Sequence, residues 1–418
     1  MKQTKNIPKG YKDSPVGVIP KEWRVYKLEN IIIENKLGGN YENSESNEGV
    51  PVIKMGNVGR GVINLEKIQC LPQRDFFSTE DILQKGDLLF NTRNTLDLVG
   101  KVAVWRGELD FAIYNSNLLK IVFDPSYVDS SYYMNYIFNS HIGLSQLRGI
   151  ATGTTSVAAI YNRDLEKILF PLPSLVEQKK IVEILSTWDE AINKQSQLVI
   201  QLQLRKKALM QQLLSGKKRL KGFTKEWKEY KIRNFAKEYS LKNKGNKELT
   251  VLSCTKYDGL VPSLEYFGRQ VFSDDISTYK LVPKGYFAYA TNHIEEGSIG
   301  YQDFINEGVI SPMYTVFKTD ENINDYFLYP ILKSHKLIYE YNARMEGSID
   351  RRGGLRWEAF SSIKVRIPSY EEQTAIAKVL FMADYEINFA RQKLDALRTQ
   401  KKGLMQQLLT GKKRVQIN

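Results

Sequence analysis

The chain has 418 residues, and its 60 Lys and Arg against 47 Asp and Glu leave a net charge of +13 at pH 7. This length predicts two or three domains, and the positive charge favours a polyanionic partner such as nucleic acid or an anionic membrane surface. Two cysteines exclude a disulfide-stapled secreted protein, so we expect a cytoplasmic one, and no apolar run approaches the roughly 20 residues of a membrane-spanning helix.

Two kinds of region alternate along the chain. Short apolar runs punctuated by Gly, Asn and Asp, such as 102–105 and 251–254, predict two β-rich heads. Two long segments that start at Pro-Ser and stop at Gly predict helices, so we expect an α+β protein in which mixed, β-rich domains alternate with two long helices. The expected boundaries are an N-terminal segment at 1–22, a first head at 23–172, a first helical region at 173–221, a second head at 222–367 and a second helical region at 368–418.

An internal repeat supports this division. Residues 173–219 and 368–414 are identical at 23 of 47 positions, without a gap, at a constant offset of 195. The heads in front of these segments correspond only weakly, for example at Trp23 and Trp227. The pattern indicates duplication of one unit of head plus helix, after which the heads diverged and the helices did not.

Both helical segments carry apolar residues at alternating steps of four and three, which is typical of a coiled-coil seam. Lys206 and Lys401 occupy corresponding positions within this pattern. A helix from Ile181 to Leu213 would be about 50 Å long. The predicted seam is Ile181, Leu185, Trp188, Ile192, Leu202, Leu209 and Leu213 in the first copy and Ile376, Leu380, Ile387, Leu394, Leu397, Leu404 and Leu408 in the second.

Several short motifs resemble one known family. They are Tyr-Lys-Asp-Ser at 11–14, Ile-Pro-Lys-Glu-Trp at 19–23, the Pro-Leu-Pro-Ser junction followed by Glu177-Gln178, and the doubled ending Leu-Met-Gln-Gln-Leu-Leu-(Ser/Thr)-Gly-Lys-Lys-Arg. Together with the repeat, they make nearly the whole chain similar to the specificity subunit of type I restriction-modification systems.

This resemblance implies a function and a set of partners. In that family two target-recognition domains each read one half of a bipartite site in double-stranded DNA, and the two helices pair antiparallel. The helices dock modification subunits that methylate adenine, and restriction subunits complete the complex. The duplicated helix predicts two modification subunits per chain. The family also implies that S-adenosylmethionine, ATP and Mg belong to the partners, so this chain would have no cofactor.

The residues themselves give little support for catalysis. The sequence contains no Pro-Pro, which the target-amine turn of an amino-methyltransferase needs, and no Gly-Lys is followed by the Ser or Thr of a phosphate-binding loop. The three histidines do not fall at metal-ligand spacing with either cysteine. We therefore expect no catalytic residue and no metal site, and we interpret Glu177-Gln178-Lys179, a fragment found in nucleases, as a solvated first helical turn.

Two other classes of function remain open from the residues alone. One is an enzyme, either a nuclease or a methyltransferase, with an unrecognised site. The other is a structural tether or RNA-binding scaffold built on the coiled coil. Methyl transfer or DNA cleavage by the chain alone would indicate the first, and binding confined to RNA would indicate the second.

Candidate DNA contacts lie in Gly-, Asn- and Arg-rich loops. Arginine suits phosphate and guanine, asparagine suits adenine, and small hydroxyl residues can approach a phosphate closely. For the basic helix endings at 205–221 and 398–414 we prefer helix capping and partner docking over DNA contact. The candidates are Lys54, Asn57, Arg60, Arg93, Asn94, Lys101, Arg148, Thr152, Thr154, Thr155 and Ser156 in the first head, and Lys256, Tyr257, Asn292, His293, Arg344, Arg351, Arg352 and Arg356 in the second.

Overall fold

The computed structural model describes residues 7–41, 48–72, 75–154, 157–245, 247–346 and 354–417. The chain forms two compact units: Met1–Ser196 with Gln392–Asn418 make unit 1, and Gln197–Arg391 make unit 2. The longest elements are the helices α4 (Leu175–Leu213) and α9 (Tyr370–Leu408), each of 39 residues. Each helix begins in one unit and ends in the other, so each unit contains one head and a part of both helices.

The head of unit 1 is built on a four-stranded sheet of order β4-β11-β7-β9, beside a three-stranded sheet of order β10-β5-β6. Smaller sheets join β12-β13-β8, β14-β3 and β1-β2. Its strands are β1 (Tyr11–Lys12), β2 (Ile19–Pro20), β3 (Arg24–Lys27), β4 (Ile32–Leu37), β5 (Val50–Ile53), β6 (Gln69–Leu71), β7 (Leu88–Asn91), β8 (Arg93–Asn94), β9 (Val102–Val104), β10 (Ile113–Tyr114), β11 (Leu118–Phe123), β12 (Thr152–Gly153), β13 (Ala158–Ala159) and β14 (Leu169–Leu172).

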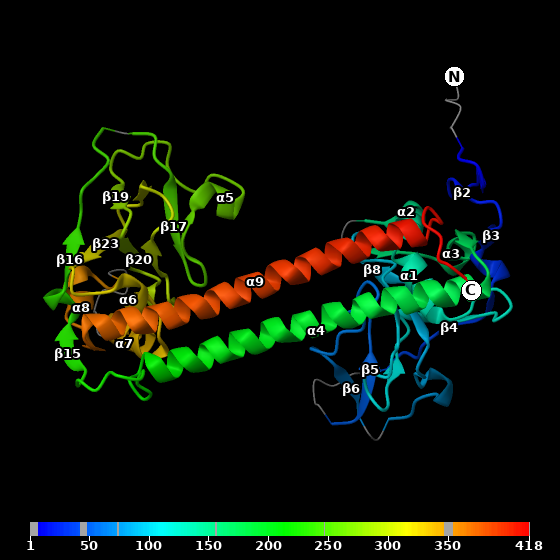
Figure 1. Ribbon diagram of the computed structural model, residues 1–418, viewed down its shortest axis with the longest axis horizontal. Coiled ribbons are helices and arrows are strands. Elements are labelled where there is room, and N and C mark those ends of the chain that lie inside the picture. Colours follow the sequence, from blue (N-terminus) through cyan, green and yellow to red (C-terminus); the bar gives the residue numbers. More distant parts are fainter. Residues whose placement is uncertain are drawn as a thin grey trace. The chain divides into compact units, whose positions relative to one another are not determined.

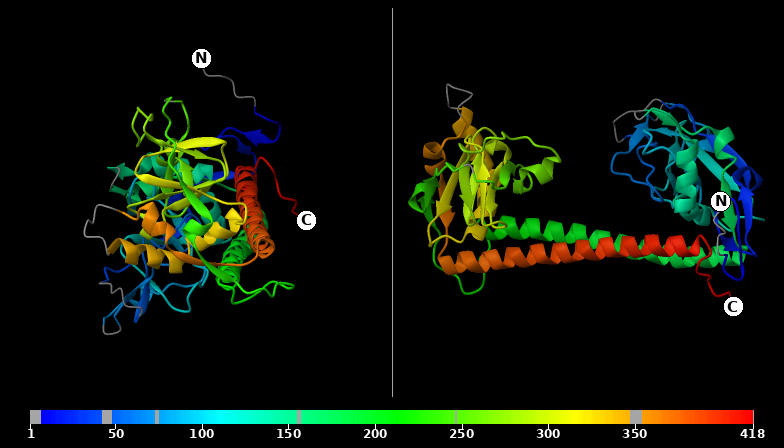
Figure 2. Two further views of the ribbon diagram at one scale, coloured as in Figure 1. Left: turned by 90° about the vertical axis from the view of Figure 1, so that its left-hand side faces the viewer. Right: turned by 90° about the horizontal axis from the view of Figure 1, so that it is seen from above.

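Short helices cover this sheet and connect it to the long helices. In α1, Tyr133, Met134, Ile137 and Phe138 are buried in a cluster that also contains residues of β7, β9 and β11. The second view of Figure 2 shows this head gathered on one side of its helix pair. Besides the start of α4, the helices of unit 1 are η1 (Leu28–Asn30), η2 (Thr79–Asp81), α1 (Ser131–Phe138), α2 (His141–Ile150) and α3 (Asn162–Leu165).

The head of unit 2 has sheets of order β16-β23-β20-β21, β18-β17-β22-β19 and β15-β24. Its strands are β15 (Lys228–Lys231), β16 (Ala236–Tyr239), β17 (Val251–Thr255), β18 (Gly259–Pro262), β19 (Lys280–Pro283), β20 (Tyr286–Ala290), β21 (Ile299–Gln302), β22 (Glu307–Ile310), β23 (Tyr314–Thr319) and β24 (Lys364–Ile367). Besides the ends of α4 and α9, its helices are η3 (Ile232–Asn234), α5 (Ser263–Phe267), η4 (Ile294–Glu296), α6 (Asp325–Leu332), α7 (His335–Glu346) and α8 (Trp357–Ser361).

The two heads share one topology despite their weak sequence similarity. The four-stranded sheets β4-β11-β7-β9 and β16-β23-β20-β21 have the same order, with antiparallel neighbours throughout. Each head also has one parallel pair, β5 with β10 and β17 with β22. The helix pairs α1-α2 and α6-α7 follow at the same place in the chain order. The sequence-predicted α+β fold with an internal pseudo-repeat is therefore confirmed.

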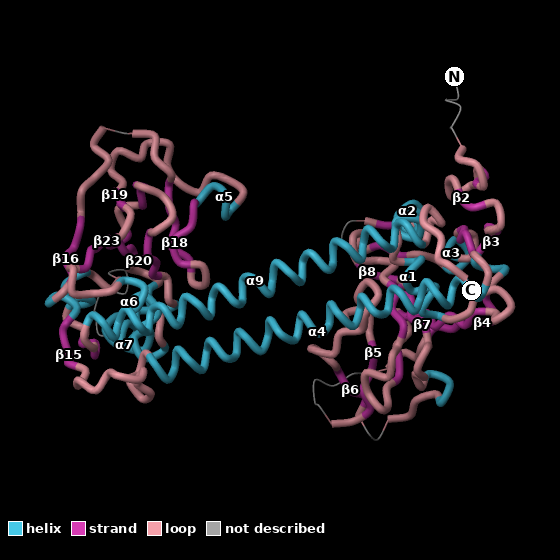
Figure 3. The backbone as a smooth tube through the Cα atoms, in the orientation of Figure 1, coloured by secondary structure: helices cyan, strands magenta, loops and turns pink. Residues whose placement is uncertain are grey.

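Within each unit the long helices run side by side in opposite directions. In unit 1, Ile181 and Leu185 of α4 share one core cluster with Leu408 of α9. In unit 2, Leu213 at the end of α4 shares a cluster with Ile376 near the start of α9. Figures 1 and 3 show the paired parts as continuous helix, whereas strands and loops make up most of each head. Among the described residues, no helix is long and apolar enough to span a membrane.

The predicted seam positions are all buried or half-buried in these helices. The two lysines within the seam pattern bind aspartates of the opposite helix: Lys401 binds Asp189 in unit 1, and Lys206 binds Asp384 in unit 2. Asp189 also accepts a hydrogen bond of 2.6 Å from the hydroxyl of Tyr136 in α1. Each charged seam position is therefore neutralised across the helix pair, which fixes the register of the helices.

A buried carboxylate anchors the first turn of α4. Glu177 is 2% exposed and accepts a 3.2 Å hydrogen bond from the indole nitrogen of Trp23. The guanidinium of Arg414, in the segment after α9, donates two more hydrogen bonds to it, of 2.7 and 2.9 Å. The interpretation of Glu177 as part of a solvated turn was therefore wrong, because the end of the second repeat folds over the start of the first helix.

We call this arrangement of one buried glutamate, one tryptophan and one arginine the clamp. Unit 2 has the same clamp with the roles of the two repeats exchanged. Glu372 in the first turn of α9 is 1% exposed and accepts hydrogen bonds from Trp227, at 3.2 Å, and from Arg219, at 2.5 and 2.6 Å. Arg219 and Arg414 end the two basic Gly-Lys-Lys-Arg motifs. Their guanidinium groups thus complete the unit of the other repeat, and the hydrogen bond to each carboxylate raises the pKa of Arg219 and of Arg414.

The glutamines that follow these carboxylates tie each helix to its head. The amide oxygen of Gln178 accepts from the backbone of Asp129 at 3.0 Å, and its nitrogen donates to the carbonyls of Tyr127 and Pro173. In unit 2, Gln373 makes the matching three bonds to the backbone of Asn324, Asn322 and Pro368. Because both side chains are buried, these bonds satisfy polar groups that would otherwise be costly to bury.

We predict that Glu372→Ala destabilises the protein by about 3 kcal/mol, because it leaves a partly buried guanidinium and the indole nitrogen of Trp227 without their acceptor. Urea unfolding followed by tryptophan fluorescence measures this loss. The control is Glu183→Ala, which breaks the exposed pair with Lys180 and should cost much less, because exposed ion pairs contribute little to stability. Equal losses for the two variants would contradict the structural role of the clamp.

Candidate nucleic-acid interface

In both heads the end of a central strand meets the loop that follows the second short helix. The backbone NH of Ile160 donates to the carbonyl of Thr92, just after β7, at 3.0 Å. In unit 2, Leu355 makes the same bond of 2.8 Å to Thr291, just after β20. Both threonine hydroxyls also donate to a neighbouring backbone carbonyl at 2.9 Å. We call this meeting point the strand-end junction, and it places the side chains that follow Thr92 and Thr291 equivalently.

The side chains at these equivalent places were among the sequence-predicted candidates. Arg93 and Asn94 follow Thr92, whereas Asn292 and His293 follow Thr291. Thr92 and Thr291 are 199 residues apart, and so are the matching pairs Lys85-Gly86 and Lys284-Gly285. This weak sequence match could therefore have identified the equivalence of the two strand ends in advance. The two heads therefore present different polar side chains from one structural position.

In unit 1 the junction extends into a small sheet. The strand β8 contains Arg93 and Asn94 and pairs with β13, which pairs in turn with β12. Arg93 is exposed, and so are Thr152 of β12 and Thr154 in the turn after it. The structure therefore brings Arg93, Asn94 and Thr152 onto one three-stranded sheet, with Thr154 in the turn that follows β12.

Three further basic candidates lie beside one another. Arg60 donates to the carbonyls of Asp97, at 3.2 Å, and Gly100, at 3.5 Å, and so lies next to Lys101. Burial, and then the like charge of Arg148 on the last turn of α2, lower the pKa of the Arg60 guanidinium. A bound anion would offset the like charges of these side chains, so Arg60, Lys101 and Arg148 stay candidates for contact with a phosphate.

Two candidates of the first head have other roles. Asn57 is only 4% exposed, and its amide bonds the backbone of Lys54, Asn64 and Lys67. The ammonium of Lys54 donates to the side chain of Gln69, and burial lowers its pKa. These residues hold a turn together, and the Asn57 amide has no free group to offer a base.

In unit 2 the junction is closed by a glycine. Gly354 has φ +56°, and a Cβ there would come within 2.6 Å of the carbonyl oxygen of Thr291 and 2.5 Å of the side chain of Asn292. The loop can therefore approach this strand end only with glycine at position 354. The exposed Arg356 lies two residues further on, at the N-cap of α8. Asn292 and Arg356 therefore each follow a member of the hydrogen-bonded pair Thr291 and Leu355.

The remaining described candidates of unit 2 lie on two turns and on α7. Tyr257 is 80% exposed, and the ammonium of Lys256 lies 5.5 Å from the centre of its ring. The carbonyl of Lys256 accepts a 3.0 Å hydrogen bond from Lys333, which connects this turn to the end of α6. His293 is exposed in front of η4, and Arg344 forms a 3.3 Å ion pair with Glu340 within α7. Four candidates lie outside the described residues, namely Thr155, Ser156, Arg351 and Arg352.

Metal-ligand side chains come together at one place in the described part of the chain. Potential ligand atoms of His293, Glu295 and Glu296 lie within 4.8 Å of one another. His293 and Glu296 are exposed, and acidic groups at a surface commonly gather without an ion. This cluster therefore gives no reason to include a metal in the chemistry of the site.

A family model described as the type I restriction modification DNA specificity domain matches residues 20–202 and again residues 219–399. The chain is also similar to a Methanocaldococcus jannaschii protein described as the specificity subunit of the type I restriction enzyme MjaX, with 25% identity over 97% of both chains. The specificity subunit of MjaVIII from the same organism is 29% identical over 51% of this chain and 50% of that one.

Solved structures show the same fold. The S subunit of a type I restriction-modification system from M. genitalium has a TM-score of 0.56 and 16% identity, covering 100% of this chain and 99% of that one. A chain from a study of complex assembly and conformational transition in the type I R-M system has a TM-score of 0.56 and 15% identity, covering 94% and 99%.

We predict that Arg148→Ala weakens binding to every DNA duplex and flattens the plot of log affinity against log salt by about one unit, which is the effect expected for the loss of one phosphate contact. Fluorescence anisotropy with specific and unrelated duplexes measures both effects. Arg163→Ala, which removes an exposed arginine that pairs with Asp164, is the control and should change neither. An unchanged salt slope for Arg148→Ala would assign this arginine to the solvated surface.

Proposed function

The chain belongs to the type I restriction-modification DNA specificity family, and on this basis we propose that it recognises a bipartite DNA site for such a complex without catalysing a reaction itself. Each head would read one half-site. The observation that carries the proposal is the strand-end junction, which occurs in both heads with different polar side chains. Equivalent placement with different chemistry is what two readers of two different half-sites require.

The chemistry of the two junctions supports distinct base preferences. In unit 1 the pair is Arg93 and Asn94, and in unit 2 it is Asn292 and His293. Arginine pairs bidentately with guanine and asparagine with adenine in the major groove. Arg60, Lys101 and Arg148, with Thr152 and Thr154, would hold the phosphates of the first half-site. In the second half-site, Lys256, Arg344 and Arg356 would do so, and the exposed Tyr257 ring offers an apolar contact.

We further propose that the long helices dock two modification subunits, which methylate adenine at N6 with S-adenosylmethionine as methyl donor. Restriction subunits using ATP and Mg would complete the assembly, in the cytoplasm where the DNA lies. The repeat supports two docking sites, since residues identical in both copies recur along α4 and α9. The sequence contains neither a Gly-Lys followed by Ser or Thr, as in a phosphate loop, nor the Pro-Pro of a target-amine turn, so we assign the chemistry to the partner subunits.

The same helices would set the length of the non-specific spacer between half-sites. Each of the 39-residue helices belongs partly to unit 1 and partly to unit 2. The pairing is fixed by specific ion pairs, Lys206 with Asp384 and Lys401 with Asp189. A stiff connection with a fixed register would make the spacer constant in length and free in sequence.

Methyl transfer to labelled duplex tests the proposal. The purified chain with S-adenosylmethionine should transfer no methyl group, and adding the modification subunit should start the reaction at one bipartite motif. Methylation or cleavage by the chain alone would show an enzyme instead. Binding to RNA but not to duplex DNA would indicate a scaffold of another kind.

We predict that lengthening both helices by one turn lengthens the spacer. Four residues inserted after Gln201 and four after Phe389, which face each other by the register of Lys206 with Asp384, add about 6 Å, or roughly two base pairs. Sequencing the methylated motif should show unchanged half-sites and a longer spacer. The control, one residue inserted after Gln201 alone, turns the rest of the seam by about 100° and should abolish assembly. An unchanged spacer in the four-residue variant would contradict the proposal.

A further inference from the structure

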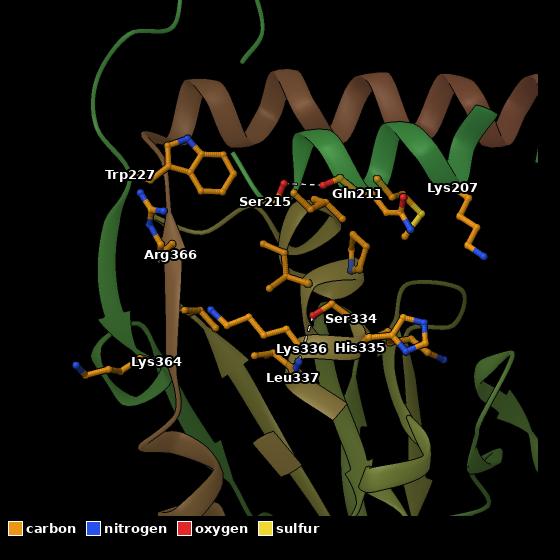
Figure 4. Close-up of a pocket in the computed structure, with 16 residues that line it drawn as sticks. Lys207, Gln211, Ser215, Trp227, Ser334, His335, Lys336, Leu337, Lys364 and Arg366 are labelled. Atoms are coloured by element: carbon orange, nitrogen blue, oxygen red, sulfur yellow. Dashed lines mark hydrogen bonds between the residues drawn. The ribbon is translucent and has the colours of Figure 1, made fainter. Parts of the chain in front are cut away.

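Unit 2 has a groove that the DNA-reading role does not use. It has a volume of about 560 Å³ and lies between the end of α4, the junction of α6 with α7, and β24. Figure 4 shows Lys207, Gln211 and Ser215 of α4 on one side and Ser334, His335 and Lys336 on the other. The groove therefore lies against the end of α4 and against β24.

The floor of the groove is apolar. Trp227, Ile331, Leu337 and Val365 line it and are themselves buried, and Met210 adds a half-buried side chain from α4. Apolar side chains placed there by a partner would gain about 25 cal/mol per Å² of surface removed from water. A phosphate backbone would make no such gain, so the floor favours a protein segment over nucleic acid.

The rim of the groove is basic. Lys207, Lys336, Lys364 and Arg366 are exposed along it. Lys364 forms an ion pair of 2.8 Å with Glu229, whereas the described residues give Lys207, Lys336 and Arg366 no acidic partner within ion-pair distance. Lys336 also lies in the first turn of α7, a 12-residue helix whose N-terminus favours negative charge.

Unit 1 has different side chains at the same places. The counterparts of Lys336, Lys364 and Arg366 are Ile142, Leu169 and Pro171, so only the lysine of the long helix recurs, as Lys402. In unit 1, Gln146 bonds both the NH and the carbonyl of Leu169 at 2.8 Å and ties α2 to β14. Its counterpart in unit 2 is Glu340, which pairs with Arg344 within α7. The charged rim is thus a property of unit 2.

We propose that this groove binds an acidic, apolar segment of a modification subunit, with carboxylates against Lys207, Lys336 and Arg366 and apolar side chains on the floor. This inference rests on the proposed function and adds to it an unequal attachment of the two modification subunits. The subunit on unit 2 has an ionic anchor that the one on unit 1 lacks.

Native mass spectrometry of the full chain with the modification subunit, without DNA, tests this. The variant Lys207→Glu/Lys336→Glu/Arg366→Glu should hold one modification subunit at concentrations where the wild type holds two, with affinity for the other lowered about tenfold or more. The control Lys237→Glu/Arg269→Glu/Lys284→Glu makes the same charge change at exposed positions of unit 2 outside the groove and should hold two.

The single variant Lys336→Glu tests the same attachment in case the triple variant misfolds. Because an acidic residue suits the start of α7, this variant should keep the wild-type melting temperature and still weaken the attachment. If the triple variant holds two subunits with wild-type affinity, or if it loses DNA affinity and no subunit, the inference is wrong and the proposed function stands. If the wild-type chain holds no modification subunit, the proposed function itself fails.

Discussion

Each unit of this protein depends on a buried carboxylate that residues from both repeats hold in place. Glu177 is bound by Trp23 of its own repeat and by Arg414 from the end of the other. Glu372 is bound by Trp227, from the head that precedes α9, and by Arg219, from the segment that follows α4. A buried charge is tolerated only when it is paired and hydrogen-bonded, so neither unit is complete without the far end of the other repeat's helix.

This reciprocal closure explains which parts of the duplicated chain still match. The helix starts, the seam and the Gly-Lys-Lys-Arg endings meet their partners across the repeat, so a change in one copy must suit the other copy as well. The heads have no such constraint at their strand-end junctions. Arg93 and Asn94 therefore correspond to Asn292 and His293 without loss of the common β-sheet framework. A protein whose helix pair and clamps stay constant, while the polar side chains at its two strand-end junctions vary, is suited to recognising two different half-sites.

Sequence periodicity and the repeat were enough to predict the long helices and the alternation of heads with helices, because both are local patterns. The burial of Glu177 could not be seen in the same way, since it depends on Arg414, which lies 237 residues away. The residues that make this contact are identical in the two copies, at Glu-Gln and at Gly-Lys-Lys-Arg. Identity between copies does not, however, show which residues contact each other. Asn57 showed the reverse problem, because an asparagine in a glycine-rich turn bonds backbone groups as readily as it could bond a base. The groove of unit 2 comes from side chains of three separate elements and has no sequence signature.

The most direct test of the account is to exchange one head and read the DNA motif. Residues 23–165 would be replaced by the head of another member of the family that keeps a tryptophan at position 23, so that Glu177 retains its donor. Single-molecule sequencing of DNA methylated by the resulting complex shows both half-sites and the spacer together. The account predicts a new first half-site, with the second half-site and the spacer length unchanged. A change in both half-sites would contradict the claim that the two heads read DNA independently on a common helix pair.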